Sequence, residues 1–396
     1  MIKKIYNYVD FKSINSSVKY LSISAFLTGM ALGYFFTVIV ITQKLSGYLE
    51  STIGIVASSF SLGLVAAGFF VSKILAKIGL YKMLLLSVSI QTVSVLAMFI
   101  YFNPINLALC HLIMGIMGGM NWMTMDTWVN IVSNDKNRGK AIGLYNSSIS
   151  IGFAVGPLIV ALFGSQGLIP IILCLLLMII RMPALYIMKN HINNVKIPEQ
   201  INKINFSLVK IAPFIFIAIF IGGINDSSFG ALFPAFMINE QFTDRSIGFY
   251  FFVGAIGGVL SQPFVGSLAD KVNKRKFLFS LLICHIIWPL LLFNFISIPL
   301  IIILSVIVWG FASVSIYTVA LAYLGERVSI KEISIATSVF IIIYEGGEFF
   351  GPIIVGLSMN QFGNPGFIYS ILFITIISLI LGIIRTIFKN NENKNY

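Results

Sequence analysis

Four acidic residues stand within long apolar stretches of the chain, and three of them have the setting for proton chemistry. Glu345 and Glu348 are three positions apart, so on a helix they lie about 4.5 Å apart along the axis and face broadly the same side. Two carboxylates this close in an apolar medium cannot both ionise cheaply, so one should take up and release a proton near neutral pH. Ionisable groups inside a membrane are costly, which makes each a functional candidate.

The third acid is Asp226, in the segment Gly222-Gly-Ile-Asn-Asp-Ser-Ser-Phe-Gly230 with Pro234 following. Glycines and a proline around polar residues predict a locally broken helix, the kind of element that forms binding sites in transporters. We expect Asp226 to lie past the middle of its span. The alternative is an acid at the mouth of the span in contact with water.

Structural roles compete with proton coupling at the other titratable positions. Either glutamate could pair with His111 or His285, or be satisfied by a serine or tyrosine. His111 is a further coupling candidate, and a neutral core histidine is the alternative. Asp126, the fourth acid, lies near the end of its apolar stretch, where capping a helix or pairing with Lys136 or Arg138 is the simpler role.

Polar and aromatic residues on neighbouring stretches could line a cavity with these acids. Trp309, Ser313 and Tyr317 recur every four residues, which places them on one face of a helix. For every candidate, ordinary packing between helices is an equal alternative. The candidates are Asn121, Trp122, Asn146, Asn225, Trp309, Ser313, Tyr317 and Tyr344.

The composition is that of an integral membrane protein. Hydrophobic residues make up 58% of the 396 positions and charged residues 10%, against about 45–50% and about 25% in soluble domains. The mean hydropathy is +0.96. The net charge of +12 is spread in small groups between apolar runs, which indicates membrane topology rather than a nucleic-acid surface. The three cysteines form no motif, so we expect no disulfide framework, no metal site and no cofactor.

A helix needs about 20 apolar residues to cross a bilayer, and this measure predicts an all-α protein with twelve spans. The expected spans are 20–42, 52–72, 83–102, 104–128, 141–163, 167–188, 210–238, 246–268, 276–296, 298–322, 333–358 and 366–388. The polar connection over 189–209 is interpreted as a cytoplasmic linker between a bundle over 1–188 and a bundle over 210–396. With both termini cytoplasmic, all but two of the 26 Lys and Arg residues lie on the inner side, the exceptions being Lys44 and Arg245.

Two copies of the pattern GxxxGP support a duplicated plan. Gly152, Gly156 and Pro157 form the first copy, and Gly347, Gly351 and Pro352 form the second, 195 positions later. Glycines four apart on a helix make a flat strip that lets another helix backbone approach closely, and a membrane bundle tolerates the proline.

The segment from Gly266 to Leu278, GSLADKVNKRKFL, resembles the signature GxLaDrxGrrxxl of the major facilitator superfamily. Gly266, Asp270, Lys271 and Arg275 match the signature, and Asn273 replaces a glycine. The resemblance implies two pseudo-symmetric six-helix bundles with this loop after spans two and eight. The first copy, 72–82, has Ala76 in place of the acid, so that half lacks the carboxylate that the signature supplies for a salt bridge.

Further segments extend the resemblance over nearly the whole chain. Asn137-Arg138-Gly139 resembles the entry to span five, and 152–157 resembles a motif associated with antiporters in that family. His111-xxx-Gly115-xxx-Gly119 fits a pattern that usually begins with Arg. The segment from Asp126 to Gly139 also resembles a poorly characterised prokaryotic branch.

These observations predict a secondary transporter in the cell membrane that moves a small organic solute by alternating access. Proton coupling is expected, and export by antiport is favoured over import by symport. Arg181 is the one basic residue well inside a span and is expected to snorkel to the membrane surface, so a strongly anionic solute is disfavoured. We expect a monomer with protons, solute and lipid as its partners.

Two other classes of protein are alternatives to a transporter. A membrane enzyme would need a convergent motif such as HxxxH or GxSxG, and none is present, so we expect no enzyme activity. A non-transporting sensor built on the same fold remains the other alternative.

Overall fold

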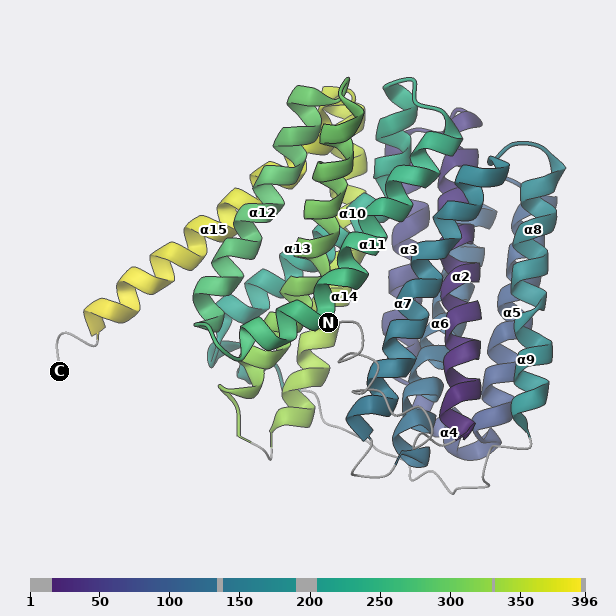
Figure 1. Ribbon diagram of the computed structural model, residues 1–396, viewed down its shortest axis with the longest axis horizontal. Coiled ribbons are helices and arrows are strands. Elements are labelled where there is room, and N and C mark those ends of the chain that lie inside the picture. The colour runs from purple at the N-terminus through teal and green to yellow at the C-terminus, as the bar shows by residue number, and fades with distance from the viewer. Residues whose placement is uncertain (1–15, 134–137, 190–204, 330–331, 393–396) are drawn as a thin grey trace, which may run out of the picture. The chain divides into compact units, whose positions relative to one another are not determined.

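A computed structural model of the protein describes residues 16–133, 138–189, 205–329 and 332–392 (Figure 1). These residues form α-helices and one short 3-10 helix, and no strand occurs among them. The elements are α2 (Ser16–Leu45), α3 (Glu50–Gly68), α4 (Val71–Ile78), α5 (Leu80–Ile100), α6 (Pro104–Val132), α7 (Arg138–Phe163), α8 (Leu168–Ile179), α9 (Arg181–Met188), η2 (Phe206–Lys210), α10 (Pro213–Asn239), α11 (Asp244–Ala269), α12 (Lys274–Phe295), α13 (Pro299–Gly325), α14 (Ile333–Phe362) and α15 (Gly366–Glu392).

The long helices follow the expected spans closely. Eleven helical segments are long and apolar enough to cross a membrane, with α8 and α9 counted together as one. The helix α11 is a further 26-residue segment between two of them. Together these segments match the twelve expected spans in order, and their ends differ from the expected ones by a few residues. The expected linker over 189–209 lies mostly outside the described residues.

Side chains at the helix ends explain why these segments begin where they do. The Asn103 side chain accepts a hydrogen bond from the backbone N–H of Asn106, and Pro104 follows as the first residue of α6. Asn is a preferred cap, and proline fits the first helical position because it has no N–H to lose there. Thr243 caps α11 in the same way. The turns between spans are therefore encoded locally.

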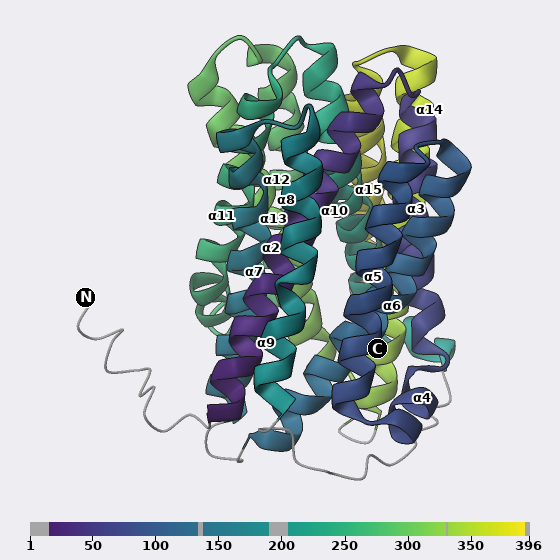
Figure 2. The same ribbon diagram turned by 90° about the vertical axis from the view of Figure 1, so that its right-hand side faces the viewer.

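The expected sixth span is two helices rather than one. Helix α8 ends at Ile179, a turn residue follows at Ile180, and α9 begins at Arg181. Figure 2 shows α8 and α9 following one another along nearly one line. Arg181 therefore stands at the start of α9, immediately after an interruption.

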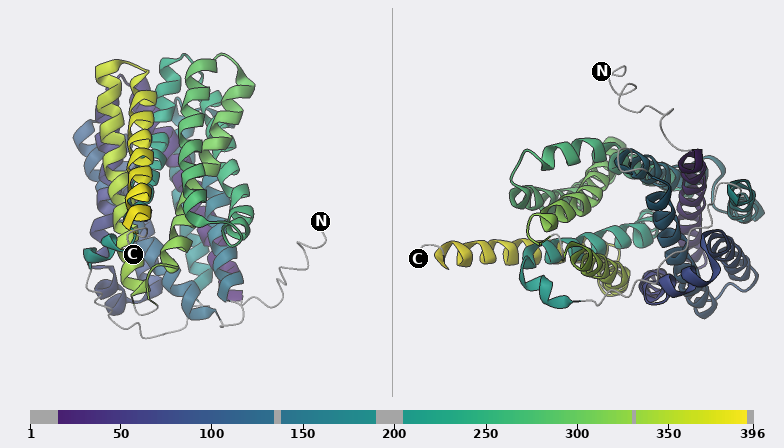
Figure 3. Two further views of the ribbon diagram at one scale, coloured as in Figure 1. Left: turned by 90° about the vertical axis from the view of Figure 1, so that its left-hand side faces the viewer. Right: turned by 90° about the horizontal axis from the view of Figure 1, so that it is seen from below.

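The described helices divide into two compact units. Unit 1 comprises residues 1–38 and 62–200, and unit 2 comprises residues 39–61 and 201–396. The last residues of α2, the turn after them and the first part of α3 thus pack with the second half of the chain. Unit 1 has an apolar core that includes Trp128 and Tyr145, and unit 2 has one that includes Leu282 and Phe340. Figure 3 shows α15 alongside α14 in unit 2.

In unit 1 the first GxxxGP copy packs directly against the backbone of α2. A Cβ added at Gly152 would collide with the carbonyl oxygen of Phe26, and one at Gly156 would collide with the backbone N of Tyr34. The approach is mutual, because Gly29 and Gly33 of α2 have the same relation to Ile149 and Phe153 of α7. The two helices therefore meet backbone to backbone along two glycine strips, as the spacing predicts.

Unit 2 repeats this arrangement with α10 and α14 (Figure 1). A Cβ at Gly347 would collide with the carbonyl oxygen of Phe220, and one at Gly351 would lie 2.6 Å from that of Ile224. On the opposite helix, Gly223 lies against the backbone of Tyr344 and Glu348. The second GxxxGP copy thus does in unit 2 what the first does in unit 1.

The expectation of a broken helix around Asp226 is wrong. Helix α10 runs without interruption from Pro213 to Asn239, with Pro234 inside it. Its paired glycines serve packing instead of unwinding, because Gly222 lies against Ile316 of α13 and Gly223 against the α14 backbone. Asp226 is also the middle residue of α10 and does not lie past it.

We predict that Gly347→Ala lowers the stability of the protein, whereas Gly346→Ala does not. A methyl group at Gly347 meets the Phe220 carbonyl, so α10 and α14 must separate, at a cost of about 1–3 kcal/mol. At Gly346 the nearest atom to an added Cβ is a ring carbon of Phe220 at 3.8 Å, and alanine is favoured over glycine in a helix by about 1 kcal/mol. Thermal unfolding of the two purified variants in detergent measures the difference, and equal melting temperatures would contradict this packing.

Candidate functional site

The three acids expected to do proton chemistry lie on two helices that touch. Asp226 is at the middle of the 27-residue helix α10, and Glu345 and Glu348 are near the middle of the 30-residue helix α14. The close approach at Gly223 brings α10 against the backbone of Glu348. The glycine packing therefore sets the distance between the helices that carry the acids.

A tyrosine of α14 links this helix to α10 through Asp226. The Tyr344 hydroxyl donates a hydrogen bond to Oδ2 of Asp226 at 2.7 Å, and Ser313 of α13 lies beside the same carboxylate. Glu345 and Glu348 lie close enough to one another to interact electrostatically, and Asp226 also acts on Glu348. One glutamate oxygen, Oε2 of Glu345, is buried without a hydrogen-bond partner among the described residues.

No Lys, Arg or His nitrogen of the described chain lies within ion-pair distance of these three acids. The acids in ion pairs are elsewhere, with Glu50 bound to Lys44 and Glu326 bound to Lys274. The described residues also contain no group of three His, Cys, Asp or Glu side chains that could hold a metal ion. The cluster of Asp226, Glu345 and Glu348, here called the acid cluster, thus has hydrogen-bond acceptors but no basic side chain of the described residues within ion-pair distance.

The expected polar face of α13 lies against the acid cluster in part. The Tyr317 ring meets the Tyr344 ring edge to face, with centroids 5.3 Å apart, and Ser313 lies beside Asp226. Trp309 is instead buried and stacks on Phe229 of α10, with the two ring centroids 3.5 Å apart. Asn225 is fully buried, and its amide donates to the Ile221 carbonyl while the amide nitrogen lies 3.5 Å from the Thr375 hydroxyl of α15.

The remaining candidates belong to unit 1. His111 is buried beside the ring of Phe35, with Nδ1 2.8 Å from the Leu107 carbonyl oxygen. Asn121 is buried, while Trp122 and Asn146 are exposed. Asp126 is half-buried next to Tyr145 of α7, and its expected partner Lys136 lies outside the described residues.

Comparison with known proteins settles the family. The Major Facilitator Superfamily model matches residues 21–214 and again 215–395. This chain belongs to the Major Facilitator Superfamily. Its members are transporters and not enzymes, so this protein is a multi-pass membrane transporter. The fold class expected from the spans and the loop motif is therefore confirmed.

Relatives and solved structures extend the match over most of the chain. The protein is 24% identical over 373 residues to the uncharacterized MFS-type transporter YfkF of Bacillus subtilis, covering 91% of this chain and 93% of YfkF. It is 22% identical over 331 residues to the uncharacterized MFS-type transporter YcaD of Escherichia coli, covering 83% of each chain.

Two solved structures share the fold. The nucleoside transporter NupG matches with a TM-score of 0.77 and 14% identity, over 93% of this chain and 98% of NupG. A bacterial homologue of the human lysosomal transporter Spinster, in an inward-facing and occupied conformation, matches with a TM-score of 0.71 and 12% identity, over 96% of each chain.

The expectation that Arg181 of this transporter snorkels to the membrane surface is wrong. The side chain is fully buried, and its Nη1 donates to Oε1 of Gln91 on α5 at 2.9 Å. Its Nε and Nη2 have no partner among the described residues. Arg181 lies on the side of α9 that packs against α5, and the periodicity of an almost wholly apolar segment could not reveal that side.

The loop between α11 and α12 of the transporter is a short turn within the segment that resembles the family signature. Asp270 directly follows α11, and the Asn273 side chain caps α12 by accepting from the N–H of Lys276 at 3.1 Å. Lys274 then forms an ion pair with Glu326 at the end of α13, at 2.6 Å. Asn273, which departs from the motif, therefore has a local role. The corresponding turn of unit 1 uses Gly79 at φ 79°.

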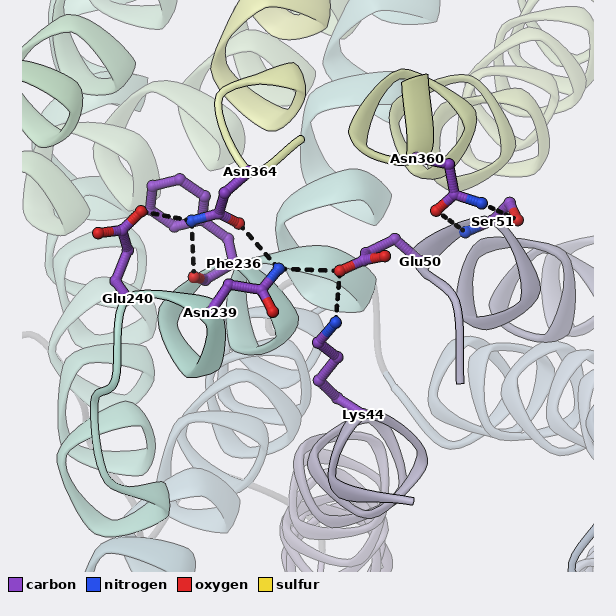
Figure 4. Close-up of polar contacts among 8 residues, drawn as sticks. All are labelled: Lys44, Glu50, Ser51, Phe236, Asn239, Glu240, Asn360 and Asn364. Carbon is purple, nitrogen blue, oxygen red and sulfur yellow. Dashed lines mark hydrogen bonds and ion pairs between the residues drawn. The ribbon is translucent and has the colours of Figure 1, made fainter. Parts of the chain in front are cut away.

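A polar network in unit 2 was not anticipated from the sequence (Figure 4). Oε1 of Glu50 binds Nζ of Lys44 at 2.5 Å and accepts from the Asn239 amide at 2.8 Å. The same amide reaches Asn364 at 3.1 Å, and Asn364 donates to Oε1 of Glu240 at 2.6 Å. The network ties the turn between α2 and α3 to the end of α10 and the turn between α14 and α15.

A second contact joins α3 to α14 nearby (Figure 4). The Asn360 amide donates to the Ser51 hydroxyl at 2.6 Å, and the Ser51 N–H donates back to Asn360 at 3.3 Å. A Cβ at Gly54 would collide with the carbonyl oxygen of Pro352. The sequence held one signal of the network around Glu50, which is that Lys44 and Glu50 place opposite charges on either side of a short turn.

We predict that Gln91→Leu destabilises the transporter and that Arg181→Met added to it restores much of the loss. Removing Gln91 leaves the buried guanidinium without its side-chain oxygen, at a cost of about 1–3 kcal/mol or more. Replacing the charge itself with an apolar side chain removes the group that needs a partner. A double-mutant cycle in thermal unfolding measures the coupling, and strictly additive effects would contradict a direct interaction.

Proposed function

We propose that this protein is a proton-coupled secondary transporter that moves a small organic solute across the cell membrane by alternating access. The observation that carries the proposal is the acid cluster. Three carboxylates lie near the middle of two touching membrane helices, and one is bonded to a tyrosine from the opposite helix. Partial burial of several acids without a neighbouring base favours uptake of a proton. Loading and release of that proton would bias the two access states.

The proposed chemistry divides between the two helices. Glu345 and Glu348 share one or two protons, since two nearby carboxylates in an apolar site resist being charged together. Asp226 responds through its bond to Tyr344, which lies one residue before Glu345 on α14. A change of protonation on α14 thus reaches α10 through one hydrogen bond, which supports coupling between the proton and the packing of these helices.

We further propose an orientation with both termini in the cytoplasm, a monomeric state and residence in the cell membrane. The distribution of Lys and Arg between the spans supports this orientation. Export by exchange for protons is favoured because of the first GxxxGP element. The alternatives are import by proton symport and a non-transporting sensor. The likeness to a nucleoside transporter and to a Spinster homologue does not select a solute, because both matches lie far below 25% identity.

We predict that Glu345→Gln and Glu348→Gln each abolish solute-driven proton movement while leaving the protein folded. Glutamine keeps the shape of the side chain but cannot load or release a proton. Proteoliposomes with an entrapped pH-sensitive dye measure the proton movement, using a solute first identified by thermal stabilisation of the purified protein.

Glu332→Gln is the matched control, because Glu332 is an exposed glutamate that precedes the same helix, α14. Normal proton movement in both cluster variants would contradict the coupling assignment. The direction of proton movement against a solute gradient separates antiport from symport, and a sensor would show no solute flux at all.

We predict that a disulfide between Ser51→Cys and Asn360→Cys stops transport reversibly. These side chains are hydrogen-bonded at 2.6 Å, so the two thiols should come within bonding reach. Alternating access requires the ends of α3 and α14 to separate in one state, which a disulfide would prevent. Solute flux before and after a mild oxidant, and again after a reductant, measures the effect.

The control pair is Ser51→Cys with Asn294→Cys, since Asn294 lies exposed near the end of α12. Undiminished flux in a fully cross-linked protein would contradict movement between α3 and α14.

A further inference from the structure

We propose that the acid cluster binds an organic ammonium ion, a protonated amine attached to an apolar or aromatic group. This inference rests on the proposed function only in taking the cluster as the transport site. It adds the chemical class of the solute, which the family does not fix.

The first argument is the balance of charge and hydrogen-bonding groups. Among the described residues, Asp226 accepts a hydrogen bond from Tyr344, and no basic side chain forms an ion pair with Asp226, Glu345 or Glu348. Oε2 of Glu345 is buried without a donor. Buried acceptors in native proteins are nearly always paired. A ligand that supplies N–H donors and a positive charge meets both needs, and a protonated amine has both.

The second argument concerns the kind of cation. A metal ion needs several oxygen or nitrogen ligands converging on one point, and no three acidic, His or Cys side chains of the described chain converge in this way. The acids are instead distributed over two helices, with Asp226 on α10 and the glutamates on α14. This distribution fits a larger cation whose charged end reaches the carboxylates one or two at a time.

The third argument is the aromatic surface next to the acids. The ring centroid of Tyr317 lies 5.3 Å from that of Tyr344 and 5.2 Å from that of Phe340, and both contacts are edge to face. Aromatic faces attract cations, and they also pack against apolar groups. The combination therefore favours an amine with an apolar body over a small hydrophilic ammonium ion.

The fourth argument links this ligand to the proton. A proton and an ammonium ion carry the same charge, so exchanging one for the other leaves the charge of the half-buried cluster unchanged. The titratable side chains at the acid cluster, where this exchange would take place, are those of the three acids, Tyr344 and, from α13, Tyr317. An anion or a neutral solute provides no such compensation. Exchange of an amine for a proton is thus the transport mode that keeps the cluster neutralised in both states.

The test measures ligand binding to the purified full-length protein in detergent at one fixed pH, by thermal shift and calorimetry. The probes are 2-phenylethylamine and tryptamine, with 2-phenylethanol and tryptophol as neutral analogues and phenylacetate and indoleacetate as anionic analogues. We expect the amines alone to raise the melting temperature. We expect Asp226→Asn to weaken amine binding about tenfold or more, because loss of one partner of a desolvated charge pair costs more than 1.4 kcal/mol.

Two further variants keep the test decisive if Asp226→Asn does not fold. Glu345→Gln and Glu348→Gln should each weaken amine binding, and the exposed Glu332→Gln should bind as the wild type does. The inference is overturned if neutral or anionic analogues bind as tightly as the amines, if neither amine binds at millimolar concentration, or if the folded cluster variants keep the wild-type affinity for amines.

The result of this binding test can be distinguished from a test of the proposed function, because binding in detergent is measured without a proton gradient. Amine binding that depends on the cluster, combined with normal proton movement in the glutamine variants, would overturn proton coupling at this pair and leave the inference standing. A neutral solute whose proton-coupled flux requires Glu348 would overturn the inference and leave the proposed function standing.

Discussion

The close approach of α10 and α14 is the constraint on which the candidate site depends. Gly223, Gly347 and Gly351 bring the two backbones together with no side chain between them. This contact places Asp226 within reach of Tyr344 and holds Glu348 against α10. Membrane helices lack a hydrophobic driving force for association, so close van der Waals packing between small residues is the means available. With larger residues at these positions, α10 and α14 would lie farther apart, and so would the acids that they carry.

The same packing occurs twice, which gives the duplicated plan a physical meaning. In unit 1, α2 and α7 meet through Gly29, Gly33, Gly152 and Gly156 as closely as α10 and α14 meet in unit 2. The acids, however, are concentrated on the second pair of helices. Unit 1 buries groups of another kind, such as His111 and the Arg181–Gln91 pair. A common scaffold thus carries different chemistry in its two copies.

Most of the fold was predictable because apolar runs of fixed length and GxxxGP spacing are local properties of the sequence. The interruption at Ile180 and the continuity of α10 were not, since a glycine or proline can either break a helix or permit close packing. Gly222 and Gly223 do the second, and only the position of the neighbouring helix decides between the two.

The acids of the candidate site were predictable from the sequence, but their hydrogen-bond partners were not. The rarity of carboxylates in apolar segments identified Asp226, Glu345 and Glu348, but nothing local pointed Tyr344 at Asp226. The side of α9 on which Arg181 lies was hidden for the same reason, because nearly every neighbour in the segment is apolar. The network around Glu50 depends on partners as distant in sequence as Asn239 and Asn364, and pairing over such separations leaves no periodic signal.

The membership of residues 39–61 in unit 2 has a consequence for biosynthesis. Ser51 is separated from its partner Asn360 by 309 positions, and a ribosome adding about 5–20 residues per second needs about 15–60 s to cover that distance. During this interval the ends of α2 and α3 enter the bilayer without the helices they finally contact. Lys44 and Glu50 are six positions apart, so they can form their ion pair as soon as both have been synthesised. The turn between α2 and α3 therefore has its two opposite charges paired before the rest of the chain is made.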